Sequence, residues 1–141
     1  MLLADDNLDD RLLFEEPFFE MMAYVELKTV KDGDELMSSL LKPDATIPDI
    51  LFLDLNMPRM NGKECLEVIR RHPFLKDLRI VIYSTHLSKK EADYMYELGA
   101  NLYIKKPNTV SELRAMMEKV LAIDWDDYTP QPKRENFVWE N

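Results

Sequence analysis

The 141-residue chain contains little cysteine and little glycine. Its single cysteine, Cys65, cannot form an intramolecular disulfide, and it cannot build a metal cluster on thiolates. The three glycines, Gly33, Gly62 and Gly99, form neither a G-x-G-x-x-G run nor a P-loop. These scarcities argue against a disulfide-stapled scaffold, a thiolate metal protein and a nucleotide-binding enzyme.

Positive charge is also scarce, because 18 Lys and Arg residues face 27 Asp and Glu residues, for a net charge of −9. Such a balance argues against direct nucleic-acid binding, which needs a basic surface to release counterions. Apolar runs such as Ile50–Leu53 and Ile80–Tyr83 are too short to cross a bilayer. An acid at Asp5 interrupts any secretory signal, so we expect a cytoplasmic protein without a membrane partner. The chain starts almost inside its first predicted strand, which leaves open whether residues precede Met1.

Short apolar segments alternate with segments of helical spacing. The predicted strands are Leu2–Ala4, Val25–Val30, Ile50–Leu53, Ile80–Tyr83 and Leu102–Ile104. The predicted helices are 8–22, 33–41, 62–71, 88–98 and a last one capped by Thr109 or Ser111, with an apolar stripe of Leu113, Met116, Met117, Val120 and Leu121. Five strands alternating with five helices predict a doubly wound α/β fold, with helices on both faces of a parallel sheet.

The character of the chain changes after Ile123. Residues 124–141 contain two prolines and show no helical period, which is typical of an appended tail. Four aromatic side chains in it are unusual for a disordered segment: Trp125, Tyr128, Phe137 and Trp139. We therefore predict a domain over residues 1–123 and a C-terminal tail over 124–141. The tail is either mobile or packed on its own domain, with docking to a partner as the alternative.

Polar residues stand where four of the predicted strands end. They are Asp5 and Asp6, Asp54, Ser84 and Thr85, and Lys105, Lys106 and Pro107. Ligands of an open parallel sheet bind beyond the carboxyl ends of its strands, so these residues should converge. Three close carboxylates repel one another, and Mg²⁺ relieves that repulsion. Asp54 would then be a nucleophile toward a phosphoryl group whose oxygens the lysine and a hydroxyl stabilise.

Four segments carry a family resemblance: ADD (Ala4–Asp6), LFLDLNMPRMNG (Leu51–Gly62), IVIYST (Ile80–Thr85) and KKP (Lys105–Pro107). Together they resemble the receiver domain of response regulators in two-component signalling, over about residues 1–123. The resemblance implies a flavodoxin-like, five-stranded parallel sheet in the order 2-1-3-4-5.

The same resemblance implies the roles of the acidic residues. Asp54 would accept a phosphoryl group from a histidine kinase or a phosphotransfer protein. Asp6, Asp54 and the main-chain carbonyl of Asn56 would ligate Mg²⁺, with Asp5 assisting through water, and Lys106 would pair with the phosphoryl group.

The switch residues also follow from the resemblance. Ser84 takes the place of the hydroxyl that moves to the phosphoryl group, with Thr85 as the alternative in the neighbouring register. Tyr103 matches the aromatic residue that turns into the vacated space, and Pro107 resembles a cis-proline that fixes the lysine. His86, with Asn56, lies where the rate of phosphoryl hydrolysis is tuned; a solvated loop histidine is the alternative. The fourth helix, fifth strand and fifth helix would form the face for a downstream effector protein or a homodimer.

The function expected from these residues is that of a stand-alone phosphorelay receiver. It is not an enzyme on external substrates, although it takes part in its own Mg²⁺-dependent phosphotransfer and dephosphorylation. Three alternatives stay open: a degenerate receiver that acts without phosphorylation, a receiver fragment of a hybrid kinase, and a phosphatase or phosphotransferase with a covalent aspartyl-phosphate. The last is disfavoured, because Asn56 stands where such an enzyme needs a second acid.

Overall fold

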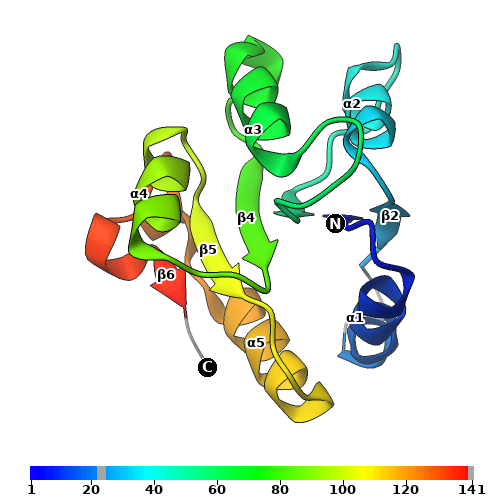
Figure 1. Ribbon diagram of the computed structural model, residues 1–141, viewed down its shortest axis with the longest axis vertical. Coiled ribbons are helices and arrows are strands. Elements are labelled where there is room, and N and C mark those ends of the chain that lie inside the picture. Colours follow the sequence, from blue (N-terminus) through cyan, green and yellow to red (C-terminus); the bar gives the residue numbers. More distant parts are fainter. Residues whose placement is uncertain (22–24, 140–141) are drawn as a thin grey trace.

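Six parallel strands form one sheet in the order β2-β1-β3-β4-β5-β6 (Figure 1). The computed structural model describes residues 1–21 and 25–139. The strands are β1 (Leu2–Ala4), β2 (Lys28–Val30), β3 (Ile50–Leu53), β4 (Arg79–Ser84), β5 (Leu102–Lys105) and β6 (Val138–Trp139). The predicted fold and the order of its first five strands are confirmed. The predicted count of five strands is one short, because the C-terminal segment adds β6 beside β5.

Five α-helices and three 3₁₀-helices connect or follow the strands. They are α1 (Leu8–Met21), α2 (Gly33–Leu41), α3 (Gly62–Arg71), η1 (Pro73–Leu75), α4 (Lys89–Glu97), α5 (Val110–Ala122), η2 (Trp125–Tyr128) and η3 (Arg134–Asn136). Met22, the predicted last residue of the first helix, lies outside the described residues. Over residues 1–21 and 25–139, none of the helices is both long and apolar enough to cross a membrane.

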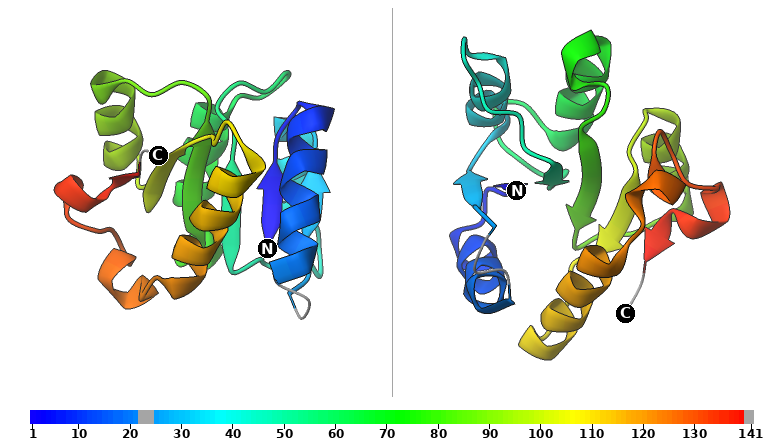
Figure 2. Two further views of the ribbon diagram at one scale, coloured as in Figure 1. Left: turned by 90° about the horizontal axis from the view of Figure 1, so that it is seen from below. Right: turned by 180° about the vertical axis from the view of Figure 1, so that it is seen from behind.

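The sheet separates two hydrophobic layers. In Figures 1 and 2, α2, α3 and α4 cover one face, and α1 and α5 cover the other. β3 serves both layers, because its side chains alternate: Leu51 and Leu53 pack with α2, α3 and α4, and Phe52 packs with α1 and α5. Burial on both faces explains why this strand is a continuous apolar run.

All five α-helices begin at side-chain caps. Each cap accepts a hydrogen bond from the backbone N–H three residues further on; the caps are Asn7, Asp32, Asn61, Ser88 and Thr109. For the last helix, the cap is therefore Thr109 and not Ser111. An N-cap contributes roughly 1 kcal/mol, and each of these fixes where the chain turns after leaving the sheet.

The C-terminal segment, residues 124–139, packs along the outer side of β5. Phe137 has no exposed surface, and its ring lies 5.1 Å from that of Tyr96 and 6.4 Å from that of Tyr103, centroid to centroid. The Tyr103 amide donates to the Phe137 carbonyl over 2.9 Å. Trp139 pairs with Ile104 in the parallel register of β5 and β6. This segment thus covers the strand that would otherwise form the edge of the sheet.

Asn101 fastens the start of this segment to the sheet. Its buried side-chain oxygen accepts from the Ile80 amide at 2.9 Å and from the Arg70 guanidinium at 3.0 Å. Its side-chain nitrogen donates to the carbonyls of Tyr128 and Pro130, both at 2.9 Å. One buried amide therefore uses both of its ends, and this is the arrangement in which a buried polar group stabilises a fold.

Candidate functional site

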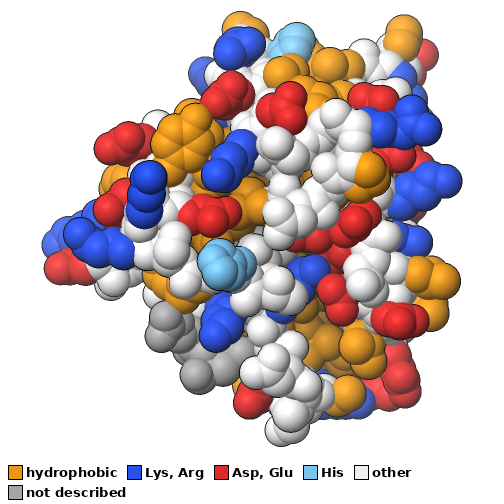
Figure 3. All heavy atoms as spheres, in the orientation of Figure 1, with side chains coloured by type: hydrophobic (Ala, Val, Ile, Leu, Met, Phe, Trp, Pro, Cys, Tyr) orange, Lys and Arg blue, Asp and Glu red, His pale blue; other side chains and the backbone are white. Residues whose placement is uncertain are grey.

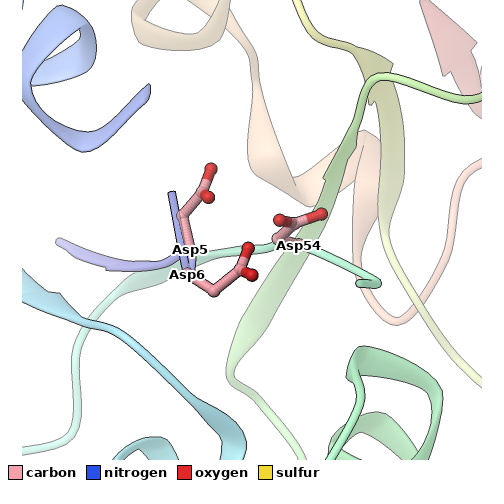
Figure 4. Close-up of side chains that lie close together, drawn as sticks. All are labelled: Asp5, Asp6 and Asp54. Atoms are coloured by element: carbon pink, nitrogen blue, oxygen red, sulfur yellow. The ribbon is translucent and has the colours of Figure 1, made fainter. Parts of the chain in front are cut away.

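Three carboxylates meet at the carboxyl ends of β1 and β3. Ligand oxygens of Asp5, Asp6 and Asp54 lie within 4.8 Å of one another (Figure 4). Asp5 and Asp54 are buried, and Asp6 is exposed. The Asp54 amide donates to the Ala4 carbonyl over 2.9 Å, which continues the pairing of β1 with β3 and ties the two acidic segments together. The predicted convergence of these acids is thus present in the structure.

The loop after Asp54 returns close to it at Gly62. A Cβ atom built at Gly62 would overlap the Asp54 carbonyl, and it would lie 2.8 Å from the Cα of Leu55. The Gly62 amide donates to the Leu55 carbonyl over 3.0 Å. Any larger residue would push α3 away from the acidic site, so this glycine is required by close backbone approach.

Lys106 brings a positive charge to the acids. Its Nζ lies 2.7 Å from Oδ2 of Asp5, 2.9 Å from Oδ2 of Asp10 and 3.5 Å from Oδ2 of Asp54. Its amide donates to the Ser84 carbonyl over 2.7 Å, which anchors the residue where β4 and β5 end. Burial alone would lower the pKa of Lys106, but the nearby carboxylates of Asp5, Asp10 and Asp54 outweigh it, so the pKa lies above its usual value. The lysine is therefore charged throughout the physiological range.

The Asp54 carboxyl has a strongly altered acidity. Burial is the largest cause and raises its pKa from 3.8 to about 7, against the lowering effect of Lys106. The charges of Asp5 and Asp6 raise it further, and the Asn56 amide, which donates to Asp54 Oδ1 over 3.3 Å, lowers it. A group held near neutrality in a cluster of like charges is typical of a functional site. A second cation beside it would favour the ionised, nucleophilic form.

The donor set fits a hard divalent cation. Oδ2 of Asp5 is buried and has no hydrogen-bond partner, because Lys106 Nζ approaches it closely but outside hydrogen-bond geometry. Carboxylate oxygens at these separations, with one exposed acid that leaves room for retained water, are what Mg²⁺ prefers. In Figure 3, acidic side chains gather around the hollow near the middle of the face shown.

The hydroxyl side of the site is built by the loop after β4. Ser84 is fully buried and its Oγ accepts from the His86 amide over 3.2 Å, whereas Thr85 is exposed. Ser84 is thus the hydroxyl that faces inward, as strand alternation requires. The His86 side chain is exposed at the rim, and Asn56 is exposed on the opposite loop.

Tyr103 lies inside the protein, on the side of β5 that faces α4. It is fully buried, and its hydroxyl already donates to the His86 carbonyl over 2.6 Å, while burial raises its pKa to about 12. The predicted movement of Tyr103 when Ser84 shifts stays a prediction. Phe137 of the C-terminal segment packs against the tyrosine ring and covers its outer side.

Pro107 differs from its predicted geometry. Across residues 1–21 and 25–139 the cis peptide bond is Thr129–Pro130, so the predicted cis bond before Pro107 is wrong for this structure. A trans X-Pro bond is intrinsically favoured by about 0.5–1 kcal/mol. The lysine before it is held in place by the Ser84 carbonyl and by its carboxylate partners.

Asp10 belongs to the site and was not among the predicted site residues. It lies in the first turn of α1 and hydrogen-bonds Lys106, with the distance given above. The sequence offered one signal for it: Asp10 is an acid in the first turn of the helix that directly follows the Asp5-Asp6 pair.

Comparison with known proteins defines the class. Residues 1–118 match the family model of the response regulator receiver domain. The chain belongs to this family. Response regulator Rcp1 of Synechocystis sp. is 28% identical over 124 residues, which cover 85% of this chain and 84% of Rcp1.

Solved structures agree with this assignment. The phosphorylated cyanobacterial phytochrome response regulator RcpA is 30% identical, with a TM-score of 0.78 and 91% of each chain covered. The bacteriophytochrome response regulator RtBRR is 29% identical, with a TM-score of 0.69, covering 88% of this chain and 78% of its own. Rcp1 has been solved with bound Mn²⁺, at 27% identity, a TM-score of 0.74, and 86% and 91% coverage.

Proposed function

We propose that this protein is a cytoplasmic response regulator that accepts a phosphoryl group on Asp54 from a histidine kinase or a phosphotransfer protein. One observation carries the proposal: the buried Asp54 carboxylate lies among Asp5, Asp6 and the Lys106 ammonium, all at the carboxyl ends of parallel strands. A degenerate receiver would lack one of these groups.

The proposed transfer moves one phosphoryl group between two protein side chains. An ionised Oδ atom of Asp54 attacks phosphorus, the N–P bond of the donor phosphohistidine breaks, and the imidazole leaves with the electron pair and takes up a proton. Lys106 and the Ser84 hydroxyl stabilise the equatorial oxygens, which is the main requirement of phosphoryl transfer. Mg²⁺ held by Asp5, Asp6, Asp54 and the carbonyl of Asn56 would neutralise the charge that develops. Water then attacks phosphorus, so inorganic phosphate leaves and the free carboxylate returns.

Phosphorylation is proposed to shift a conformational equilibrium around Ser84. The new phosphoryl oxygens are strong acceptors and draw the Ser84 O–H donor toward Asp54, which moves its oxygen relative to the His86 amide that now donates to it. Because the His86 carbonyl also accepts from Tyr103, a shift of this loop alters the hydrogen bond that holds Tyr103 inward. The surface that changes is formed by α4, β5 with its neighbour β6, and α5. We propose that an effector protein, or a second copy of the chain, binds there.

The donor kinase is proposed to be a photoreceptor of the phytochrome class. The support is the likeness to RcpA and RtBRR, which are described as response regulators of such photoreceptors. The test compares phosphotransfer from purified, autophosphorylated phytochrome-class and chemotaxis-class histidine kinases. Faster transfer from the first supports the proposal, and faster transfer from the second contradicts it.

The central test uses a small phosphodonor, acetyl phosphate, with Mg²⁺ and intact-mass detection. We expect one phosphoryl adduct on the wild-type protein, none on Asp54→Asn, and a strong reduction when a chelator removes the metal. The matched control is Asp9→Asn, an exposed acid on α1, which should keep the adduct. A wild-type protein without an adduct, or an adduct on Asp54→Asn, would falsify the proposal.

A further inference from the structure

The Lys106 ammonium is shared among three carboxylates, and the two nearest are not the proposed phosphoacceptor. Nζ lies 2.7 Å from Asp5 and 2.9 Å from Asp10, but 3.5 Å from Asp54. The bond to Asp10 has hydrogen-bond geometry, and the lysine side chain is only 8% exposed. An ammonium group has three N–H donors and no acceptor, so each carboxylate that it contacts leaves fewer donors for the remaining ones.

Asp10 lies outside the three-acid cluster that could hold a metal. It comes from the first turn of α1, where its amide is held by the Asn7 side chain over 3.0 Å. With Tyr83 and Lys106 it lines a small cavity of about 100 Å³ between α1 and the loop after β5. Its side chain is one-third exposed, so it reaches the lysine from the solvent side.

We propose that Asp10 is a positioning residue that holds Lys106 back from Asp54 and competes with the phosphoryl group for the lysine. This inference deepens the proposed function and rests on it. In the unphosphorylated protein, Asp10 accepts a lysine hydrogen bond that a phosphoryl oxygen on Asp54 needs. Transfer of that bond from Asp10 to the phosphoryl group is then part of the phosphorylation step.

The direction of the effect follows from charge and hydrogen bonding together. Loss of the Asp10 charge frees one lysine donor for the phosphoryl oxygens, so the transfer step becomes faster. It also removes one negative charge from the path of an anionic phosphodonor, so the donor binds more readily. The first effect belongs to Asp10 alone, but the second belongs to any acid at this end of α1. Asp9, which is adjacent, exposed and not bonded to Lys106, supplies the matched comparison.

The experiment measures phosphorylation of the full chain by acetyl phosphate in Mg²⁺ as a function of donor concentration. Asp10→Asn should raise the maximal rate about three- to tenfold. A tenfold change in rate corresponds to a free energy similar to that of one hydrogen bond to a charged group. Asp9→Asn should change the half-saturating donor concentration and leave the maximal rate within about twofold. Asp10→Glu, which keeps the carboxylate, should return the maximal rate toward that of the wild type.

A second measurement asks whether Asp10 acts through the lysine. In a Lys106→Met background, Asp10→Asn and Asp9→Asn should have equal effects, because no lysine donor remains to be released. An unchanged or lower maximal rate in Asp10→Asn, or a full effect of Asp10→Asn without Lys106, overturns the positioning role while Asp54 phosphorylation stands. A wild-type protein that takes up no phosphoryl group overturns both proposals together.

Discussion

The acidic site and the C-terminal segment show two different ways in which a sequence specifies structure. The site depends on residue types at strand ends, because the parallel sheet brings Asp5, Asp6, Asp54 and Lys106 together at one edge. The C-terminal segment depends on single long-range contacts, such as Phe137 against Tyr103, for which no local pattern exists. The first region holds like charges close together at a cost in folding free energy, whereas the packing of the second stabilises the fold.

The largest expected effect tests whether the C-terminal segment is part of the core. Phe137→Ala should lower the free energy of unfolding by about 4 kcal/mol, because a fully buried ring is removed and a cavity is left. Urea unfolding measures it. Trp139→Ala, two residues further along and only half-buried, is the control and should cost clearly less. If the loss at Phe137 stayed near that of an exposed residue, the segment would not be an integral part of the fold.

At the acidic site, a substitution should raise the free energy of unfolding instead of lowering it. Since the pKa of Asp54 in the folded protein is about 7, above its ordinary value of 3.8, the folded state binds this proton more tightly than the unfolded state. Stability is therefore lost as the pH rises from about 4 to about 7, and the cost is complete above that range. Without metal, Asp54→Asn should be more stable than wild type by on the order of 4 kcal/mol at pH 8, with little difference near pH 4.

Thermal or urea unfolding at the two pH values, with chelator present, measures this difference. Asp9→Asn controls for loss of a carboxylate at an exposed position. Added Mg²⁺ should narrow the gap at pH 8, because binding to the folded wild type stabilises it. A less stable Asp54→Asn at pH 8 would show that Asp54 is not strained in the folded protein.

A smaller effect is expected on metal affinity. Asp6 is the exposed member of the three acids, so Asp6→Asn should fold normally and weaken Mg²⁺ binding by about tenfold. Calorimetric titration with Mg²⁺ measures this, and Asp9→Asn should bind as the wild type does. Equal affinities in all three proteins would remove Asp6 from the metal site.

The smallest effect is expected at the rim. His86→Ala should change the rate of loss of the phosphoryl group by about two- to fivefold, which is below 1 kcal/mol. The backbone groups of His86, which bond Ser84 and Tyr103, stay in place, so only the imidazole is tested. His72→Ala, at the end of α3 beside Phe74, should leave the rate unchanged. An unchanged rate in His86→Ala would assign the histidine to solvent only.

Much of the fold was predictable because short apolar segments alternate with segments of helical spacing along the chain. The continuous run Leu51–Leu53 required burial on both faces, and its position before Asp54 placed the acid at a strand end. Strand β6 was not predictable in this way. This strand has only two residues, Val138 and Trp139, in a proline-containing segment without a local pattern, and it lies beside β5 next to the buried Phe137.

Within the site, the carboxylates could be predicted, but the state of their neighbours could not. Tyr103 was predicted as a switch residue, but nothing local in the sequence indicates that Phe137, 34 positions later, packs against its ring. Asn101 gave no signal, since a lone asparagine before a strand is most often a turn residue. Its four partners come from β4, α3 and the C-terminal segment, which only the folded chain brings together.

The most direct test of the account locates the phosphoryl group on the chain. The protein is treated with acetyl phosphate and Mg²⁺, and borohydride then reduces the aspartyl-phosphate to homoserine, which peptide mass spectrometry assigns to a position. We expect homoserine at position 54, and no homoserine when a chelator has removed the metal beforehand. Homoserine at Asp5, Asp6 or Asp10 instead, or no conversion anywhere, would contradict it.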